Sequence, residues 1–61
     1  MYTITLINGE HHIHTYTHPY IPSVGDLIML PNKKVVEVTK RMMKSEETKP
    51  PYTVGLFIKY V

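Results

Sequence analysis

The sequence contains no cysteine among its 61 residues. Disulfide bonds and thiolate zinc sites, the usual stabilising devices of so small a domain, are therefore excluded. No stretch approaches the roughly 18 consecutive apolar residues of a membrane-spanning helix. The N-terminus alternates from its second residue and lacks the basic and apolar regions of a signal peptide. We therefore expect a cytoplasmic protein that does not enter the membrane.

Groups suited to catalysis are also sparse. Ser23 and Ser45 are the only serines, and neither lies in a nucleophile-elbow motif. The sequence has no glycine-rich phosphate loop and no carboxylates paired at a catalytic spacing. We therefore expect that the protein is not an enzyme and needs no cofactor.

The main pattern present is an alternation of period two, broken by turn residues at short intervals, which is typical of an all-β barrel or sandwich. Five runs are expected to be strands, at residues 2–7, 10–16, 27–30, 35–43 and 52–61, and all but the short run 27–30 alternate clearly. Five short strands bury one face only by curling into a small barrel or by pairing with another copy. We predict one domain, residues 1–61, folded as a five-stranded antiparallel small barrel.

Asn8-Gly9 is the strongest turn signal, because both central positions of a type I′ hairpin turn need positive φ. A turn centred there pairs Ile7 with Glu10, Thr5 with His12 and Thr3 with His14. This register puts an apolar set on the core face, and a polar set, with Glu10, His12 and His14, on the other face. The predicted core-facing set is Tyr2, Ile4, Leu6, His11, Ile13 and Thr15.

The later strands also divide into two faces. Val36 and Val38 share one face of residues 35–43, and Arg41 shares the opposite face. In the last strand Phe57 points away from the core-facing set, which is Val54, Leu56, Ile58 and Tyr60. The run Leu27–Leu30 hardly alternates, which indicates burial on both of its faces. Polar turns are expected at Val24-Gly25-Asp26 and Pro31–Lys34, and a polar loop at residues 44–51.

Residues 22–41 resemble a pattern found in SH3-like small barrels. The pattern comprises a proline, a Gly-Asp turn, an apolar strand, a polar turn and a Val-x-Val strand followed by basic residues. It is carried here by Pro22, Gly25-Asp26, Leu27–Leu30, Pro31–Lys34, and Val36 with Val38. Phages and mobile elements encode such barrels as stand-alone proteins, so the resemblance implies an SH3-like fold and an accessory protein of that kind. It transfers no site residues, because the fold hosts several functions.

The histidines at positions 11, 12, 14 and 18 raise the possibility of a metal site. On a regular strand His12 and His14 project side by side, with Glu10 next to them, and two imidazoles can converge on one zinc ion. A complete site needs further ligands, and the alternative is the polar side of an ordinary hairpin. We therefore predict no metal, and keep Glu10, His12 and His14 as candidates. Imidazoles so close together also form a pH-sensitive cluster.

Positive charge gathers between residues 33 and 49, which hold six of the seven Lys and Arg residues. Small barrels bind single-stranded nucleic acid by combining such charges with stacking aromatics. The alternative is a protein-binding patch of basic, apolar and aromatic residues around the outward-facing Phe57. The nucleic-acid candidates are Lys33, Lys34, Lys40, Arg41, Lys44 and Phe57. The protein-binding candidates are Arg41, Met43, Tyr52, Phe57 and Lys59.

The hypothesis favoured by these features is a binding module that acts through protein–protein contacts. Its concrete form is a phage or mobile-element accessory or inhibitor protein that docks on a host or viral protein. Self-association is expected as well, because a core this small typically supplies no more than about 3–5 kcal/mol. Binding of single-stranded nucleic acid is the alternative, followed by histidine-based metal binding.

Overall fold

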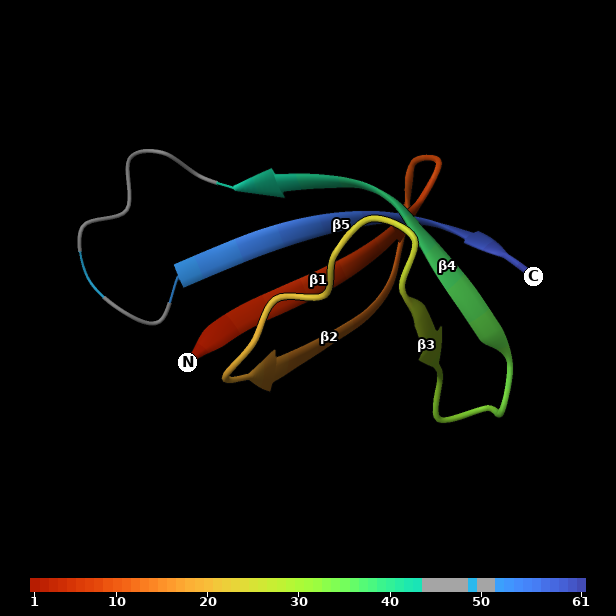
Figure 1. Ribbon diagram of the computed structural model, residues 1–61, viewed down its shortest axis with the longest axis horizontal. Coiled ribbons are helices and arrows are strands. Elements are labelled where there is room, and N and C mark those ends of the chain that lie inside the picture. Colours follow the sequence, from red (N-terminus) through yellow and green to blue (C-terminus); the bar gives the residue numbers. More distant parts are fainter. Residues whose placement is uncertain (44–48, 50–51) are drawn as a thin grey trace.

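The computed structural model describes residues 1–43, 49 and 52–61 (Figure 1). Those residues form five strands and no helix, as expected. The predicted loop at 44–51 lies outside the described residues except for Lys49. The strands are β1 (Tyr2–Asn8), β2 (His11–His18), β3 (Leu27–Met29), β4 (Val35–Met43) and β5 (Tyr52–Tyr60).

The strands form one curled sheet in the order β2-β1-β5-β4-β3. The prediction of a fully antiparallel sheet is wrong, because β1 and β5 pair in parallel at its centre. No turn joins these two strands, so turn residues gave no signal for their pairing. β2 and β3 form the two edges, and the described residues contain no pairing between them. The sheet is therefore an open half-barrel, whose curl is visible in Figure 1.

The core lies on the concave face of the sheet. The predicted inward sets are confirmed at Val36 with Val38 and at Val54, Leu56 and Ile58, all of which are buried. Leu30, just after β3, completes the core from the edge. Leu27 and Met29 are exposed, so the prediction that this strand is buried on both faces is wrong. β3 is an edge strand with only one face towards the core.

The β1–β2 hairpin has a different register from the predicted one. Gly9 has φ 62°, whereas Asn8 does not have positive φ. The turn is therefore centred on Gly9-Glu10, where a first central glycine suits type II′, and Asn8 pairs with His11. The predicted pairs Thr5–His12 and Thr3–His14 are wrong, because His12 lies opposite Ile7 and His14 opposite Leu6.

Ile13 is the extra residue between these two pairs, and it forms a β-bulge. Ile13 and Tyr16 both pack against the core. They are three positions apart, so a regular strand would direct them to opposite faces. The bulge removes this conflict, because one extra residue reverses the face to which each later side chain of β2 points. As a result, Tyr16 lies opposite the buried Ile4 on the concave face, with His14 and His18 on the same side.

A second irregularity, at Thr39, shifts the register between β4 and β5. After it Lys40 lies opposite Phe57, and Arg41 lies opposite the buried Leu56. The Thr39 hydroxyl donates to the Phe57 carbonyl at 3.1 Å. The prediction that Arg41 and Phe57 share the outer face is therefore wrong: Phe57 points outward as expected, but Arg41 is on the concave side.

Two tight turns connect the strands around β3, as predicted. In the first, Gly25 has φ 96° and the Asp26 N–H donates to the Ser23 carbonyl at 3.0 Å. This turn is bonded to β4, because Gly25 N–H donates to the Val38 carbonyl and Val38 N–H donates to the Asp26 carbonyl. In the second turn Lys33 has φ 68°, and the Asn32 side chain accepts from the Lys34 N–H at 3.0 Å. Both turns fix where β3 starts and ends.

Candidate binding groove

A groove runs along the open side of the half-barrel, between β2 and β3. Two adjoining cavities, of about 400 and 220 Å³, have His14, Leu30 and Pro31 in both of their linings. A third cavity, of about 320 Å³, adjoins the first at Ile28. We call the three together the β2–β3 groove. Its lining is Ile13, His14, Tyr16, His18, Tyr20, Ile21, Pro22, Asp26, Leu27, Ile28, Met29, Leu30, Pro31 and Asn32.

The β2 wall of the groove is a row of aromatic rings. His14 stacks on Tyr16 with centroids 5.7 Å apart, and the Tyr16 and His18 centroids are 6.4 Å apart. His18 is followed by Tyr20 at 6.1 Å. The row exists because the Ile13 bulge places His14, Tyr16 and His18 on the concave face. The sequence contained one signal for this bulge: Ile13 and Tyr16 are three positions apart, and a regular strand cannot direct both of these side chains to the core.

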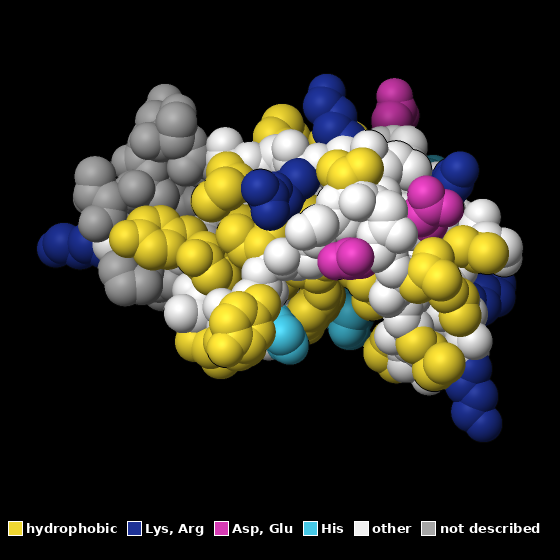
Figure 2. Space-filling view, in the orientation of Figure 1, with side chains coloured by type: hydrophobic (Ala, Val, Ile, Leu, Met, Phe, Trp, Pro, Cys, Tyr) yellow, Lys and Arg dark blue, Asp and Glu magenta, His cyan; other side chains and the backbone are white. Residues whose placement is uncertain are grey.

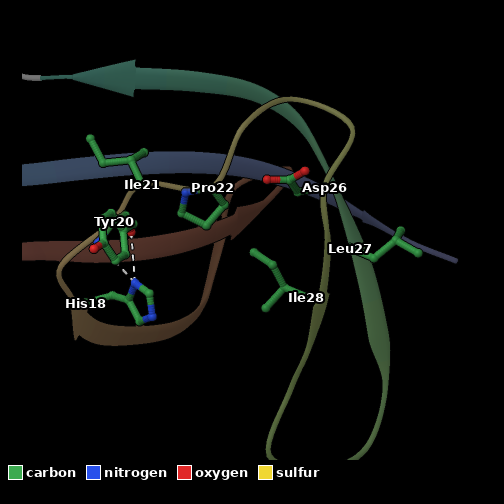
Figure 3. A pocket seen from close by; sticks show the side chains of 7 residues that line it. All are labelled: His18, Tyr20, Ile21, Pro22, Asp26, Leu27 and Ile28. Atoms are coloured by element: carbon green, nitrogen blue, oxygen red, sulfur yellow. Dashed lines mark hydrogen bonds between the residues drawn. The ribbon is translucent and has the colours of Figure 1, made fainter.

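His18 also shapes the end of this wall. The Tyr20 N–H donates to His18 Nδ1 at 3.1 Å, and Nδ1 is 3.0 Å from the Tyr20 carbonyl oxygen. The imidazole therefore closes a turn over Pro19. Figure 3 shows this ring turned towards the Tyr20 backbone, with Ile28 pointing from β3 towards it and Leu27 pointing away.

The opposite wall comes from β3 and its two turns. Ile28 and Leu30 face the groove with apolar side chains, and Met29 lines its rim with 71% of its surface exposed. Asp26 is the one formally charged residue of the lining, and its Oδ2 accepts from the Ser23 N–H at 2.8 Å. Figure 2 shows hydrophobic side chains in separate groups along the lower edge of the molecule, with histidine between them. The groove is thus almost uncharged, apolar around Ile28, Leu30 and Pro31, and more polar towards His18 and Asp26.

Burial affects one ionisable group of the wall. Desolvation raises the pKa of the Tyr16 hydroxyl above its ordinary value of 10.0. The phenol is therefore uncharged over the physiological pH range, and it lines the groove as a neutral donor and acceptor.

The metal candidates are not brought together. The bulge puts His14 on the concave face and leaves His12 opposite Ile7 on the outer face, while Glu10 lies in the turn. Among the residues that the structure describes, no group of three His, Asp or Glu side chains is placed to hold a metal ion. The expected side-by-side pair of imidazoles fails because the strand is not regular at Ile13.

The predicted protein-binding patch is divided between the two faces. Arg41, Met43 and Tyr52 lie on the concave side, where the Tyr52 ring is 6.0 Å from that of Tyr2. Phe57 and Lys59 lie on the outer side, and Lys59 forms an exposed ion pair with Glu37 at 3.9 Å. The five residues therefore do not form one surface.

The basic candidates are spread in the same way. Of these basic residues, Lys40 lies next to Phe57. Its Nζ is over the Phe57 ring, 5.9 Å from the centroid. Lys34 lies near the far end of β4, with its Nζ 5.7 Å from the Tyr60 centroid, and Lys33 is in the adjoining turn. Lys44 lies outside the described residues. Phe57 and Lys40 are thus the aromatic–basic pair that the outer face provides.

The described part of the chain includes no helix that is long and apolar enough to cross a membrane. No protein-family model, curated protein or solved structure matches this chain. The resemblance of residues 22–41 to SH3-like barrels of phages therefore stays a prediction.

Proposed function

We propose that this chain is a non-catalytic binding module that acts through protein–protein contacts made by the β2–β3 groove. The observation that supports the proposal is the lining of the groove: aromatic and aliphatic side chains are accessible between two sheet edges, and none of the described strands connects those edges. Protein interfaces are centred on such side chains, with few charges among them. Tyr20, with 74% of its surface exposed, and Met29 are available as contacts on the two rims.

The chemistry of the lining favours binding over catalysis. Asp26 is engaged in its own turn, where it accepts from the Ser23 N–H. His18 is engaged in the same way with the Tyr20 backbone. These two groups are hydrogen-bonded to the backbone of their own turns and so support the shape of the groove.

The partner, on this proposal, is a host or viral protein, and the chain is an accessory or inhibitor protein of a phage or mobile element with an SH3-like fold. This narrower part rests on the resemblance of residues 22–41. Its test is the identity of the neighbouring genes, which should encode phage or mobile-element functions. Genes of a conserved metabolic operon would contradict it.

The binding role is tested with peptides as probes. A displayed library of random peptides of about twelve residues, enough to span the eight residues of β2, is selected against the immobilised chain. We expect selected peptides to lose at least about tenfold in affinity when Tyr20 and Met29 are both replaced by serine. Met42→Ser is the matched control, because Met42 is also exposed but lies on the outer face opposite Gly55. Failure to select any peptide, or equal losses in both variants, would contradict the groove as a binding site.

Binding of single-stranded nucleic acid by the outer face is the second candidate function. It is favoured by one observation, the Lys40 ammonium over the Phe57 ring, which combines a charge with a stacking surface. Affinity for a fluorescent oligonucleotide should fall steeply between about 50 and 200 mM salt and should drop in Lys40→Ala. Arg41→Ala, on the concave side, is the control. Absence of binding at low salt would end this alternative.

A further inference from the structure

We propose that the groove receives an extended segment of the partner protein, which pairs with the free edge of β2 as an additional strand. The inference deepens the proposed function and rests on it. An unpaired edge strand presents a row of N–H and C=O groups, and folded proteins usually protect such an edge with Lys, Pro or a very short length. β2 is eight residues long and contains neither Lys nor Pro, nor Arg, Asp or Glu. Its bulge lies at Ile13, so the residues after it, 14–18, form an edge without a further irregularity. The opposite edge, β3, has only three residues. Of the two edges that the described residues form, β2 is thus the one left open.

The space beside β2 suits one more strand. No Cα atom of β2 lies within 8 Å of a Cα atom of β3, so the two edges are too far apart to pair. Side chains from both edges nevertheless line the same cavity at Tyr16 and Ile28. The two edges are therefore farther apart than paired strands, yet close enough for an occupant paired with β2 to contact both walls.

The occupant is a segment with both of its edges free, and not the folded sheet of a second copy. In a second copy β2 is already paired with β1, so its edge would bring β1 along as the next strand. That strand would have to lie where β3 and its turns wall the groove. A terminal or loop segment of a partner brings no such neighbour, and it is the common ligand in strand addition.

The walls define the chemistry of this segment. Alternate side chains would face the concave side, against Tyr16, Ile28 and Leu30, and should be apolar or aromatic. The intervening ones would face outward beside Thr15 and Thr17, where small polar or β-branched residues fit. Charge occurs only towards the ends, with Asp26 near His18 and Lys33 just beyond Asn32. A segment antiparallel to β2 therefore carries a basic residue towards its N-terminus and an acidic one towards its C-terminus.

Strand addition makes a prediction that side-chain docking does not share. The test uses the highest-affinity peptide selected from the random library, with single backbone N-methyl groups placed along it. Because every second N–H of an added strand bonds to its neighbour, methylation should lower affinity by about tenfold or more at alternate positions only. In parallel, amide hydrogen exchange of the isotope-labelled chain should slow within β2 when the peptide is bound. The amides of β5, at the centre of the sheet, are the internal control.

Each outcome is decisive. Alternating sensitivity together with slowed exchange in β2 supports the added strand. A peptide that still needs Tyr20 and Met29, but shows no alternation and leaves β2 exchange unchanged, overturns the added strand while the groove remains a binding site. If no selected peptide depends on Tyr20 and Met29, the proposed function itself fails. If β2 exchange in the free chain slows with increasing protein concentration, a second copy occupies the edge and the free-segment proposal is wrong.

Discussion

Lys40 and Phe57 face each other across β4 and β5 on the outer side of the sheet, with the Lys40 Nζ 5.9 Å from the ring centroid. The bulge at Thr39 creates this pair, since a regular strand would place Thr39 opposite Phe57. The ring also lies beside Ile7 of β1, its partner in the parallel pairing. The outer face is therefore a packed surface as well as a candidate nucleic-acid site.

The energy of the Lys40–Phe57 contact is open to a double-mutant cycle. The variants are Lys40→Ala, Phe57→Ala and the double variant. We expect a coupling free energy of about 0.5–1 kcal/mol, which is usual for a cation over an aromatic ring at an exposed site. Urea unfolding of the four proteins measures it. The cycle between Lys59 and Glu37, an exposed ion pair, is the comparison and should give a coupling between 0 and about 1 kcal/mol that declines in salt.

Leu56→Ala should leave the chain largely unfolded at physiological temperature. Leu56 is fully buried on the central strand β5, and removing such a side chain costs about 2–5 kcal/mol. A core of this size supplies only about 3–5 kcal/mol in total. Leu27→Ala is the matched control, because Leu27 is 64% exposed on β3 and should change the unfolding free energy by less than about 0.5 kcal/mol. Circular dichroism during heating distinguishes the two variants. Similar melting curves would contradict the assignment of Leu56 to the core and of Leu27 to the surface.

Gly55→Ala and Gly25→Ala should have opposite effects on stability. A Cβ at Gly55 would meet the Ile7 Cδ1 at 3.4 Å, an ordinary contact with a movable side chain. Alanine there should stabilise by about 0.5–1 kcal/mol, since glycine in a strand has a higher entropy cost on folding. Gly25 has φ +96°, which alanine adopts only with strain, so that variant should lose about 1–3 kcal/mol. The midpoints of denaturant unfolding measure both effects against the parent chain. A stabilised Gly25→Ala variant would show that alanine fits this turn without strain.

Stability should fall in alkali partly because of Tyr16. Its folded-state pKa is raised by desolvation above the ordinary 10.0. A raised folded pKa means that the contribution of this phenol is fully present below pH 10, and is lost as pH rises through the higher folded value. Tyr16→Phe should therefore lose less stability than the parent chain as the pH rises above 10. Melting temperatures across this range measure the difference, with Tyr20→Phe as the control at an exposed ring. Parallel curves for the parent and Tyr16→Phe would contradict the role of burial.

The sequence allowed prediction of those parts of the fold that depend on local pattern. The five strands, the turns around Gly25 and Lys33, and the inward faces of β4 and β5 follow from alternation and from turn residues. The parallel pairing of β1 with β5 does not, because it joins residues about 50 positions apart and no connecting turn reports it.

The candidate site was harder to predict for a different reason. Each bulge reverses which of the later residues in its strand face the core. Arg41 therefore lies on the concave face and not on the predicted outer face, and His14 and Tyr16 also lie on the concave face. A single inserted residue has this effect because side chains alternate along a strand. The groove also depends on which edges remain unpaired, and that is a property of the whole sheet. Alternation along each strand contains no information about it.

The central position of β1 and β5 has a consequence for how the chain assembles. Without β5, the pairings that remain are the β1–β2 hairpin and the β3–β4 hairpin, which have no strand in common. A two-stranded hairpin is at best marginally stable in water, so neither half is expected to persist by itself. β5, which follows the other four strands in the sequence, is therefore the strand that joins the two halves, and the concave face, the groove included, is completed only after β5 has docked between β1 and β4.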